Sequence, residues 1–393
     1  MPTLHRTVAA VAALVILAGC SHAQDGPQTP GARADDSTGQ HAKAAWRYDY
    51  AGQDTNAAFS DVAAASADDA WAIAKSPVTG VVDNQDTHLF HYDGQRWQPF
   101  DLPPALRRLD DLPLVRLEAS GPRDMWLFAG IVTHPDRSHP PLAAHWNGTT
   151  WRTVRLPHDF PQAVRGAAVF SPDDAWAVDG SDTAWHWDGQ QWQARSLPAK
   201  AQALAGTSGK DLWAVGSGST RRGQSRPAAL RWDGSRWKKA TLPAMPPGPQ
   251  DDPHSGELTR AVALSAQDVR AFGQVSSEGG DTDAYSAGLA LRWDGTRWSQ
   301  DDGVPCCVSG QAGGVLFLTP KRYLTSAGRQ ERITQPPCPG RRSGKLGESG
   351  CRQKLQLEEY AAIPESREVW GVGSVRGQAA PSRPVIVRLR AAP

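Results

Sequence analysis

Four aspartates recur in one short motif and are the first residues that suggest acid–base chemistry. The motif is Ser/Gly-x-x-Asp-x-Trp, usually followed by Ala, and it places Asp69, Asp124, Asp174 and Asp211 at equivalent positions. An acidic catalytic site would need these carboxylates to converge on one point. Because each belongs to its own repeat, we expect them instead to accept backbone N–H groups in hairpin turns.

Three histidines suggest metal binding. His91, His145 and His186 occupy one position in three successive repeats, and Arg231 and Arg292 fill it in the next two. Metal ligands must lie about 2 Å from a single ion. Repeats arranged around an axis keep equivalent positions apart, so we expect no metal site here.

Other catalytic signatures are missing from the sequence. It has no Gly-x-Ser-x-Gly elbow, no His-Glu-x-x-His and no phosphate-binding Gly-x-x-x-x-Gly-Lys-Ser/Thr. We therefore predict no catalytic residues, no metal and no cofactor. Lys and Arg number 42 against 41 Asp and Glu, a balance that argues against nucleic acid as a partner.

The aspartate motif must be positioned by strands, because a second motif follows it in the repeat. This second motif is aromatic-Asp/Asn-Gly-x-x-Trp, often followed by Leu-Pro, and it occurs at 92–97, 146–151, 187–192, 232–237 and 293–298. Asp-Gly is a strong signal for a tight hairpin. The period is roughly 40–60 residues, the range of propeller blades. Each repeat is therefore interpreted as four short strands.

This arrangement resembles the kelch repeat from about Trp46 to Leu389. Ala214-Val215-Gly216 lies where kelch repeats carry a paired glycine, although this sequence has only one. The resemblance implies an all-β fold, a β-propeller of four-stranded antiparallel blades spanning 46–393, and a count of the second strands indicates seven blades. The second strands of the seven blades are assigned to Trp71, Trp126, Trp176, Trp213, Arg270, Tyr323 and Trp370.

The last repeat ends at Leu389 without a tryptophan strand. The segment Ala45–Tyr50 resembles the outer strands that begin at Trp97 and Trp192. We expect this N-terminal strand to pair into the last blade and close the ring. Closure removes the free edges that an open array would expose.

The N-terminus has the features of a targeting segment. Arg6 precedes the apolar run Val8–Ala18, which is too short to span a bilayer. The run ends in Leu-Ala-Gly-Cys at Cys20, which resembles the lipobox of bacterial lipoproteins; an ordinary signal peptide that ends near a cysteine is the alternative. The resemblance implies a signal peptide at 1–19 and a lipidated Cys20. Residues 20–45 are predicted to form a flexible tether.

Four further cysteines fit export to an oxidising compartment. An even set implies two disulfides with three possible pairings. We favour a bond from each member of the adjacent pair to one of the other two, which bracket the degenerate sixth repeat; a zinc site is the alternative. The four are Cys306, Cys307, Cys338 and Cys351.

Connection lengths predict where binding occurs. Long connections alternate with tight turns, so all the long ones should share one face of the disc, which we expect to bind a partner. Charged loop residues could meet an acidic polymer or a protein. Those assigned to ligand binding are Arg221, Arg222, Arg226, Glu278, Asp281, Asp283, Arg341 and Arg342. The spacing of the three acidic ones is not that of a known calcium loop, and a solvated acidic loop is preferred.

Two functions remain open. The preferred one is a monomeric, non-enzymatic binding or scaffold lipoprotein on the outer face of the cytoplasmic membrane, with a protein or an envelope polysaccharide as its partner. The alternative is a propeller hydrolase or lyase that acts on envelope polysaccharide. Two carboxylates roughly 5–10 Å apart near the central channel would favour the enzyme. Its candidate carboxylates are Asp110, Asp111, Asp251 and Asp252.

Overall fold

The computed structural model describes residues 44–54, 56–77, 85–106, 114–130, 141–160, 163–219, 224–246, 255–277, 285–304, 308–325, 328–337, 353–377 and 381–390. The predicted signal peptide, Cys20 and nearly all of the tether lie outside these residues. So do all four later cysteines, and their pairing stays a prediction. None of the described residues forms a helix long and apolar enough to cross a membrane.

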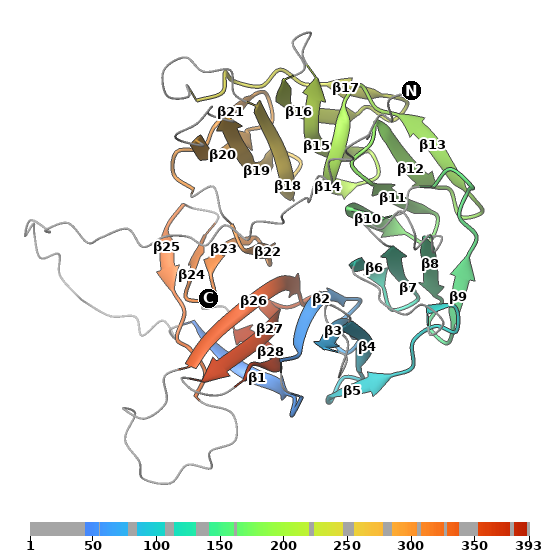
Figure 1. Ribbon diagram of the computed structural model, residues 1–393, viewed down its shortest axis with the longest axis vertical. Helices are drawn as coiled ribbons and strands as arrows, with labels where there is room; N and C mark the ends of the chain where they lie inside the picture. Colours follow the sequence, from blue (N-terminus) through green and yellow to red (C-terminus); the bar gives the residue numbers. More distant parts are fainter. Residues whose placement is uncertain are drawn as a thin grey trace, which may run out of the picture. The chain divides into compact units, whose positions relative to one another are not determined.

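The described strands form seven separate four-stranded sheets arranged as a ring (Figure 1). Every strand pairing is antiparallel, and within each of the first six sheets the strands follow chain order. Blades 1 to 4 are formed by β2(Ala58–Ala64), β3(Ala70–Pro77), β4(Gln85–Tyr92) and β5(Trp97–Phe100); β6(Leu114–Gly121), β7(Asp124–Gly130), β8(Leu142–Trp146) and β9(Trp151–Val154); β10(Gly166–Ser171), β11(Asp174–Val178), β12(Thr183–Trp187) and β13(Trp192–Ser196); β14(Lys200–Ser208), β15(Asp211–Ser219), β16(Ser225–Trp232) and β17(Trp237–Lys239).

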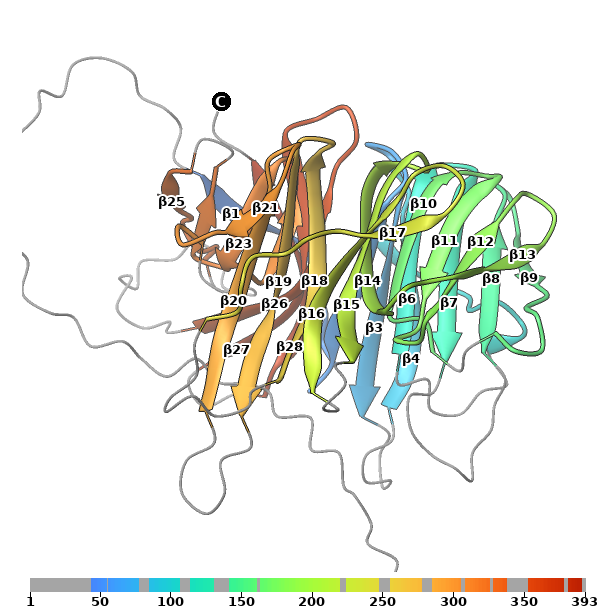
Figure 2. The same ribbon diagram turned by 90° about the horizontal axis from the view of Figure 1, so that it is seen from above.

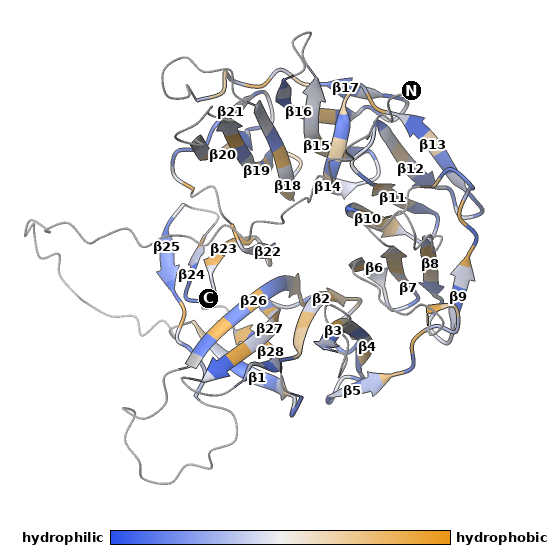
Figure 3. Ribbon diagram, in the orientation of Figure 1, coloured by the Kyte–Doolittle hydropathy of each residue, from blue (hydrophilic) through white to orange (hydrophobic). Residues whose placement is uncertain are grey.

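The last three blades complete the ring and confirm the predicted all-β, seven-bladed propeller. They are formed by β18(Ser255–Ser265), β19(Asp268–Ser277), β20(Tyr285–Trp293) and β21(Trp298–Gln300); β22(Gly310–Ala312), β23(Val315–Thr319), β24(Arg322–Leu324) and β25(Gln330–Arg332); β26(Gln353–Ala362), β27(Glu368–Gly377), β28(Arg383–Arg390) and β1(Ala45–Ala51). Because each blade packs against two neighbours, a second strand such as β7 is buried on both faces. Along the inner strand β26, hydrophobic and hydrophilic residues alternate (Figure 3).

Blade 7 is closed by the N-terminal strand, as predicted. β1 pairs with β28 in the order β1-β28-β27-β26, with Trp46 opposite Leu389. Trp46 is 1% exposed, and its indole N–H donates to the Pro320 carbonyl of blade 6 at 2.8 Å. One side chain from the start of the chain therefore fastens the last blade to its neighbour.

Blade 6 differs from the sequence-based assignment in one residue. Tyr323 was placed on the second strand, but it lies on the third strand, β24. Phe317 of β23 pairs with Tyr323 as Trp71 of β3 pairs with His91 of β4. Phe317 therefore takes the tryptophan position. The aspartate motif is missing here, so the sequence offered no marker for the second strand.

The repeat tryptophans pack between blades, as expected. Trp71 of blade 1 lies 5.0 Å from Trp146 and 5.2 Å from Trp151 of blade 2, measured between ring centroids. Trp213 of blade 4 contacts Trp293 and Trp298 of blade 5 in the same way, at 4.9 and 5.0 Å. Such aromatic clusters bury large apolar areas and join each blade to the next.

The motif aspartates have a structural role, but not the predicted one. Their carboxylates contact other side chains in place of backbone amides. Asp124 contacts His145 Nε2 at 2.7 Å and accepts the Trp126 indole N–H at 3.1 Å. His145 also stacks on Trp126, with centroids 4.6 Å apart. Arginine takes the histidine position in blade 4, where Arg231 contacts Asp211 at 3.5 Å.

Backbone N–H groups are instead accepted by the aspartates of the Asp-Gly turns. Asp93 Oδ1 accepts the amides of Gln95 and Arg96 at 3.0 and 2.9 Å. These two hydrogen bonds lower the pKa of the Asp93 carboxyl, and the bond from the Arg96 amide has the larger effect. Gly94 has a φ of 87°, which favours glycine, and the equivalent glycines share this geometry.

The histidines do not converge on a metal. His91, His145 and His186 each contact the aspartate of their own blade, at 2.9, 2.7 and 3.0 Å. The described part of the chain contains no group of three His, Cys, Asp or Glu residues that could hold an ion.

The two faces of the ring differ in their connections. Strands run from one face to the other (Figure 2), so first-to-second and third-to-fourth strand turns share a face. These are tight, as at 122–123 and 147–150. Second-to-third connections and most links between blades emerge on the opposite face and include 131–141 and 240–254. We call these the turn face and the loop face.

Candidate functional site: the central channel

The innermost strands of the blades enclose a cavity of about 1190 Å³ at the centre of the ring. Its wall is formed by the first strand of each blade, with additional residues from β3 and β19. Eight charged side chains of the described residues line it, four cationic and four acidic. They are Lys75, Arg116, Arg165, Arg260, Asp61, Glu118, Glu358 and Glu359. The formal charges of this lining therefore cancel.

Four of these charged residues belong to one layer of the channel. The same pairing between the first and second strands recurs in six blades. One residue of the first strand lies opposite the second-strand residue that follows the tryptophan position by two. Asp61 lies opposite Ile73 in this way, and Glu359 lies opposite Val372. Equivalent positions of neighbouring blades lie at one height around the axis. In order from blade 1, the layer consists of Asp61, Arg116, Gly166, Ala203, Arg260 and, in blade 7, Glu359.

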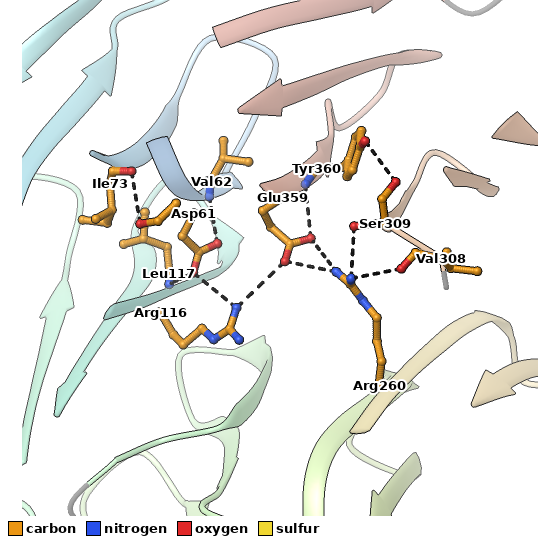
Figure 4. Close-up of polar contacts among 11 residues, drawn as sticks. Asp61, Val62, Ile73, Arg116, Leu117, Arg260, Val308, Ser309, Glu359 and Tyr360 are labelled. Atoms are coloured by element: carbon orange, nitrogen blue, oxygen red, sulfur yellow. Dashed lines mark hydrogen bonds and ion pairs between the residues drawn. The ribbon is translucent and has the colours of Figure 1, made fainter. Parts of the chain in front are cut away.

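Arg260 and Glu359 form a paired contact past the short blade 6. Arg260 Nη2 donates to both oxygens of Glu359, at 3.1 and 3.2 Å. Its Nη1 donates to the carbonyls of Val308 and Ser309, just before β22, at 3.4 and 3.0 Å (Figure 4). The guanidinium thus joins blades 5, 6 and 7, and most of its donors are used.

Asp61 is the most deeply buried carboxylate of the layer, with 4% exposure. It accepts the amides of Val62 and Leu117 at 2.8 and 3.1 Å. Burial raises its pKa to about 7, against the opposing effect of the Arg116 cation. The two hydrogen bonds from backbone amides hold this carboxylate between blades 1 and 2.

Arg116 lies between two carboxylates without bonding tightly to either. Its Nη1 is 4.0 Å from Asp61 and 3.9 Å from Glu359, longer than a hydrogen bond (Figure 4). Its Nε is buried and has no hydrogen-bond partner within the described part of the chain. The side chain is 36% exposed. Arg116 is therefore a cation with free donors beside the cavity.

Glu118 lies two residues after Arg116 on β6, so both side chains are on the same face of the strand. Burial raises its pKa to about 8, and the nearby charge of Asp61 raises it further than Arg116 lowers it. Among the described residues no hydrogen bond or ion pair to Glu118 is formed. Its carboxyl group therefore offers hydrogen-bond acceptors beside the free donors of Arg116.

The two positions that follow Arg116 in the layer carry no long side chain. Gly166 of blade 3 follows Arg116 in the layer, and Ala203 of blade 4 follows Gly166. A Cβ on Gly166 would lie 2.9 Å from the Ala203 Cα, too close for any real contact. Close approach of blades 3 and 4 thus requires glycine at this position.

Of the sequence-predicted ligand residues, the structure describes Arg226 alone. It donates to the Met245 sulfur at 3.7 Å and to Gln224 Oε1 at 3.3 Å, and it lines an apolar pocket of about 730 Å³ with Leu242 and Pro243. The remaining predicted residues lie outside the described part of the chain. They are Arg221, Arg222, Glu278, Asp281, Asp283, Arg341 and Arg342, and the candidate enzyme carboxylates Asp110, Asp111, Asp251 and Asp252.

No protein-family model and no curated protein matches this sequence. Solved propellers are similar in fold alone. YCF48 bound to a D1 peptide is 14% identical with a TM-score of 0.45, and the match covers 88% of this chain and 97% of the other. The WD40 propeller of Doa1 is 9% identical with a TM-score of 0.43, covering 87% and 96%. The fucose-specific lectin from Aleuria aurantia is 14% identical with a TM-score of 0.35, and the match covers 63% of this chain and 77% of the other.

The channel residues were not among those predicted from the sequence, although a signal for them exists. Asp61, Arg116 and Arg260 each precede the tryptophan position of their own repeat by ten residues, as do Gly166 and Ala203. In blade 7 the interval is eleven, because the first hairpin is one residue longer. Alignment of the repeats on their tryptophans would have revealed this column.

Proposed function

We propose that this protein is an exported binding or scaffold lipoprotein, anchored through Cys20 and binding its partner on the loop face of the propeller. The observation that carries the proposal is the asymmetry of the two faces. Every connection on the turn face is short, whereas the long connections, such as 131–141 and 240–254, all belong to the loop face, which also has short ones at 179–182, 197–199 and 320–321. Loops on a rigid scaffold are the usual location of binding residues, because they vary without disturbing the fold.

The channel carboxylates support binding rather than hydrolysis. Glycosidases that use two carboxylates need one as an acid and one as a base or nucleophile, both free to act. Asp61 is held by two backbone amides, and Glu359 is paired to Arg260 through both oxygens. The remaining carboxylates of the lining are Glu118 and Glu358, and Glu358 accepts a hydrogen bond from the Gln356 amide at 3.0 Å. The polysaccharide hydrolase or lyase remains the alternative proposal, with its candidate loop carboxylates outside the described residues.

A capture experiment tests the binding face. The full chain, tagged and purified in detergent, is incubated with cell-envelope extract from its source, and the retained protein and polysaccharide are measured. Lys200→Glu combined with Lys239→Glu changes exposed residues at the loop face. Lys210→Glu combined with Arg297→Glu makes the same charge change on the turn face. We expect only the loop-face variant to lose the retained material; equal loss in both variants would contradict the proposal.

The lipid anchor has a separate test. A diacylglycerol thioether and a further acyl chain bind membranes stably, because each buried methylene contributes about 0.8 kcal/mol. Cys20→Ala should move the protein from the membrane pellet to the soluble exported fraction. Cys20→Ala protein that stays in the pellet would overturn the anchoring proposal without affecting the loop-face proposal.

A further inference from the structure

Two neighbouring residues of the channel have polar groups that the protein itself does not use. Arg116 has a buried Nε without a hydrogen-bond partner among the described residues, and both of its carboxylate neighbours are beyond hydrogen-bond distance. Glu118 has no bonded partner within the same part of the chain. Unused donors and acceptors enclosed in a cavity cost free energy unless water or a ligand satisfies them.

Charge at this position selects the kind of ligand. A simple cation that approached Glu118 would also meet Arg116. A simple anion that approached Arg116 would also meet Glu118, Asp61 and Glu359. A group that carries both charges avoids each repulsion, because its anionic end faces the guanidinium and its cationic end faces the carboxylate.

Spacing on the strand fits such a group. Residues two apart on a strand lie on the same face with Cα atoms about 7 Å apart, which side chains of this length bridge toward a common point. Guanidinium groups bind carboxylates through two parallel hydrogen bonds.

We propose that the central channel binds a zwitterionic α-amino acid group, its carboxylate held by Arg116 and its ammonium by Glu118. The group belongs to a free amino acid or to an equivalent unit of a larger ligand. This inference rests on the proposed binding function and adds a ligand class to it. Arg260 and Glu359 act as positioning residues, because their mutual pair holds Glu359 near Arg116.

Titration calorimetry of the full chain tests the proposal directly. The probes are glycine and the L and D forms of alanine, lysine and glutamate. We expect at least one to bind with a Kd below about 1 mM, where the binding free energy is about −4 kcal/mol. Its N-acetyl and carboxamide derivatives, which each lack one charge, should bind at least tenfold more weakly. Absence of binding by every probe, or equal binding of a blocked derivative, would overturn the proposal.

Variants assign the two charges to their residues. Glu118→Gln and Arg116→Met should each weaken binding of the free amino acid at least tenfold. Arg165→Met is the matched control, because Arg165 lines the same cavity but is bonded to Gln202 at 3.1 Å. Melting temperatures establish that each variant is folded. If Arg116→Met fails to fold, Glu118→Gln alone decides: unchanged affinity in that nearly isosteric variant overturns the proposal.

Proton release gives an independent measurement. Burial raises the pKa of Glu118 to about 8, and the charges of Asp61, Arg116 and Glu359 also act on this carboxyl. A bound ammonium lowers that pKa, so binding at pH 7.5 should release a proton and make the heat depend on the buffer. Glu118→Gln should abolish this dependence. A loop-face capture that succeeds while all amino acid probes fail would refute this inference and leave the proposed function standing.

Discussion

The indole N–H of Trp370 donates a 2.9 Å hydrogen bond to Asp49, a residue 321 positions earlier in the chain. In blade 3 the equivalent indole of Trp176 bonds the aspartate two residues before it. Blade 7 has Glu368 at that place, and its carboxylate pairs with Arg388 at 2.7 Å. The closing strand therefore supplies both the fourth strand of the blade and the acceptor that its tryptophan needs.

Closure by β1 predicts a large effect of one substitution. Trp46→Ala should destabilise the domain by about 3–5 kcal/mol, because it removes a fully buried indole and its bond to blade 6. Calorimetric melting gives the measurement. Arg47→Ala, at an exposed position of the same strand, should change stability little. An unchanged melting temperature after deletion of Ala45–Tyr50 would contradict ring closure.

The contact between Arg260 and Glu359 predicts a measurable coupling energy. In a double-mutant cycle of Arg260→Ala and Glu359→Ala, we expect the two residues to be coupled by about 1 kcal/mol, because the contact is bidentate and partly buried. The exposed pair Arg297 and Asp294 is the control and should show almost no coupling. Denaturant unfolding measures each corner. Equal coupling energies in the two cycles would show that the channel pair stabilises the fold no more than an exposed ion pair does.

The raised pKa of Glu118 predicts how stability depends on pH. In the unfolded chain this carboxyl ionises near its model value of 4.5, whereas the folded pKa is about 8. Between these values the folded state binds the extra proton, so the stability contribution is complete below about pH 4.5 and is lost as pH rises to 8. Glu118→Gln should therefore gain at least about 1 kcal/mol relative to wild type between pH 5 and 9, or about 2 °C.

Melting curves at several pH values give that measurement. Glu358→Gln, an exposed carboxylate in the same cavity, is the matched control and should follow the wild type. A Glu118→Gln curve parallel to that of the wild type would show that the carboxyl is not buried as described.

The exchange of histidine for arginine between blades predicts which substitutions are tolerated. Asp124 is 2% exposed and depends on side-chain partners. His145→Arg should keep stability within about 1 kcal/mol, because Arg231 contacts the equivalent aspartate in blade 4. His145→Leu should cost about 1–3 kcal/mol by leaving a buried carboxylate with one partner fewer. Chemical denaturation distinguishes the two, and equal losses would contradict the shared role.

Sequence patterns predicted the blades because their determinants are local. The Asp-Gly turns and the tryptophans that follow them mark strand ends within a few residues, and Gly94 has the φ that this signal requires. The strand that completes blade 7 was also predicted, since β1 repeats the pattern around Trp97. In blade 6 these signals are absent, and the second strand was assigned to Tyr323 in place of Phe317.

The channel layer was not predicted because its logic is not local. Asp61, Arg116 and Glu359 come from blades 1, 2 and 7 and meet only when the ring is closed. Nothing in the sequence near any one of them indicates a partner. The predicted hydrogen-bond partners of the motif aspartates were wrong for a related reason. The partner of Asp124 is His145 on another strand, and not a backbone amide of the adjacent turn.

The pairing of β1 with β28 also fixes when the molecule can finish folding. β1 leaves the ribosome more than 300 residues before its partner strand, so it must wait unpaired while the intervening blades are synthesised. Such long-range pairing is slow to form and exposes strand edges in the meantime. An incomplete nascent chain therefore has six blades at most and a tryptophan strand without a partner, a state that calls for protection by chaperones until the last strand is delivered.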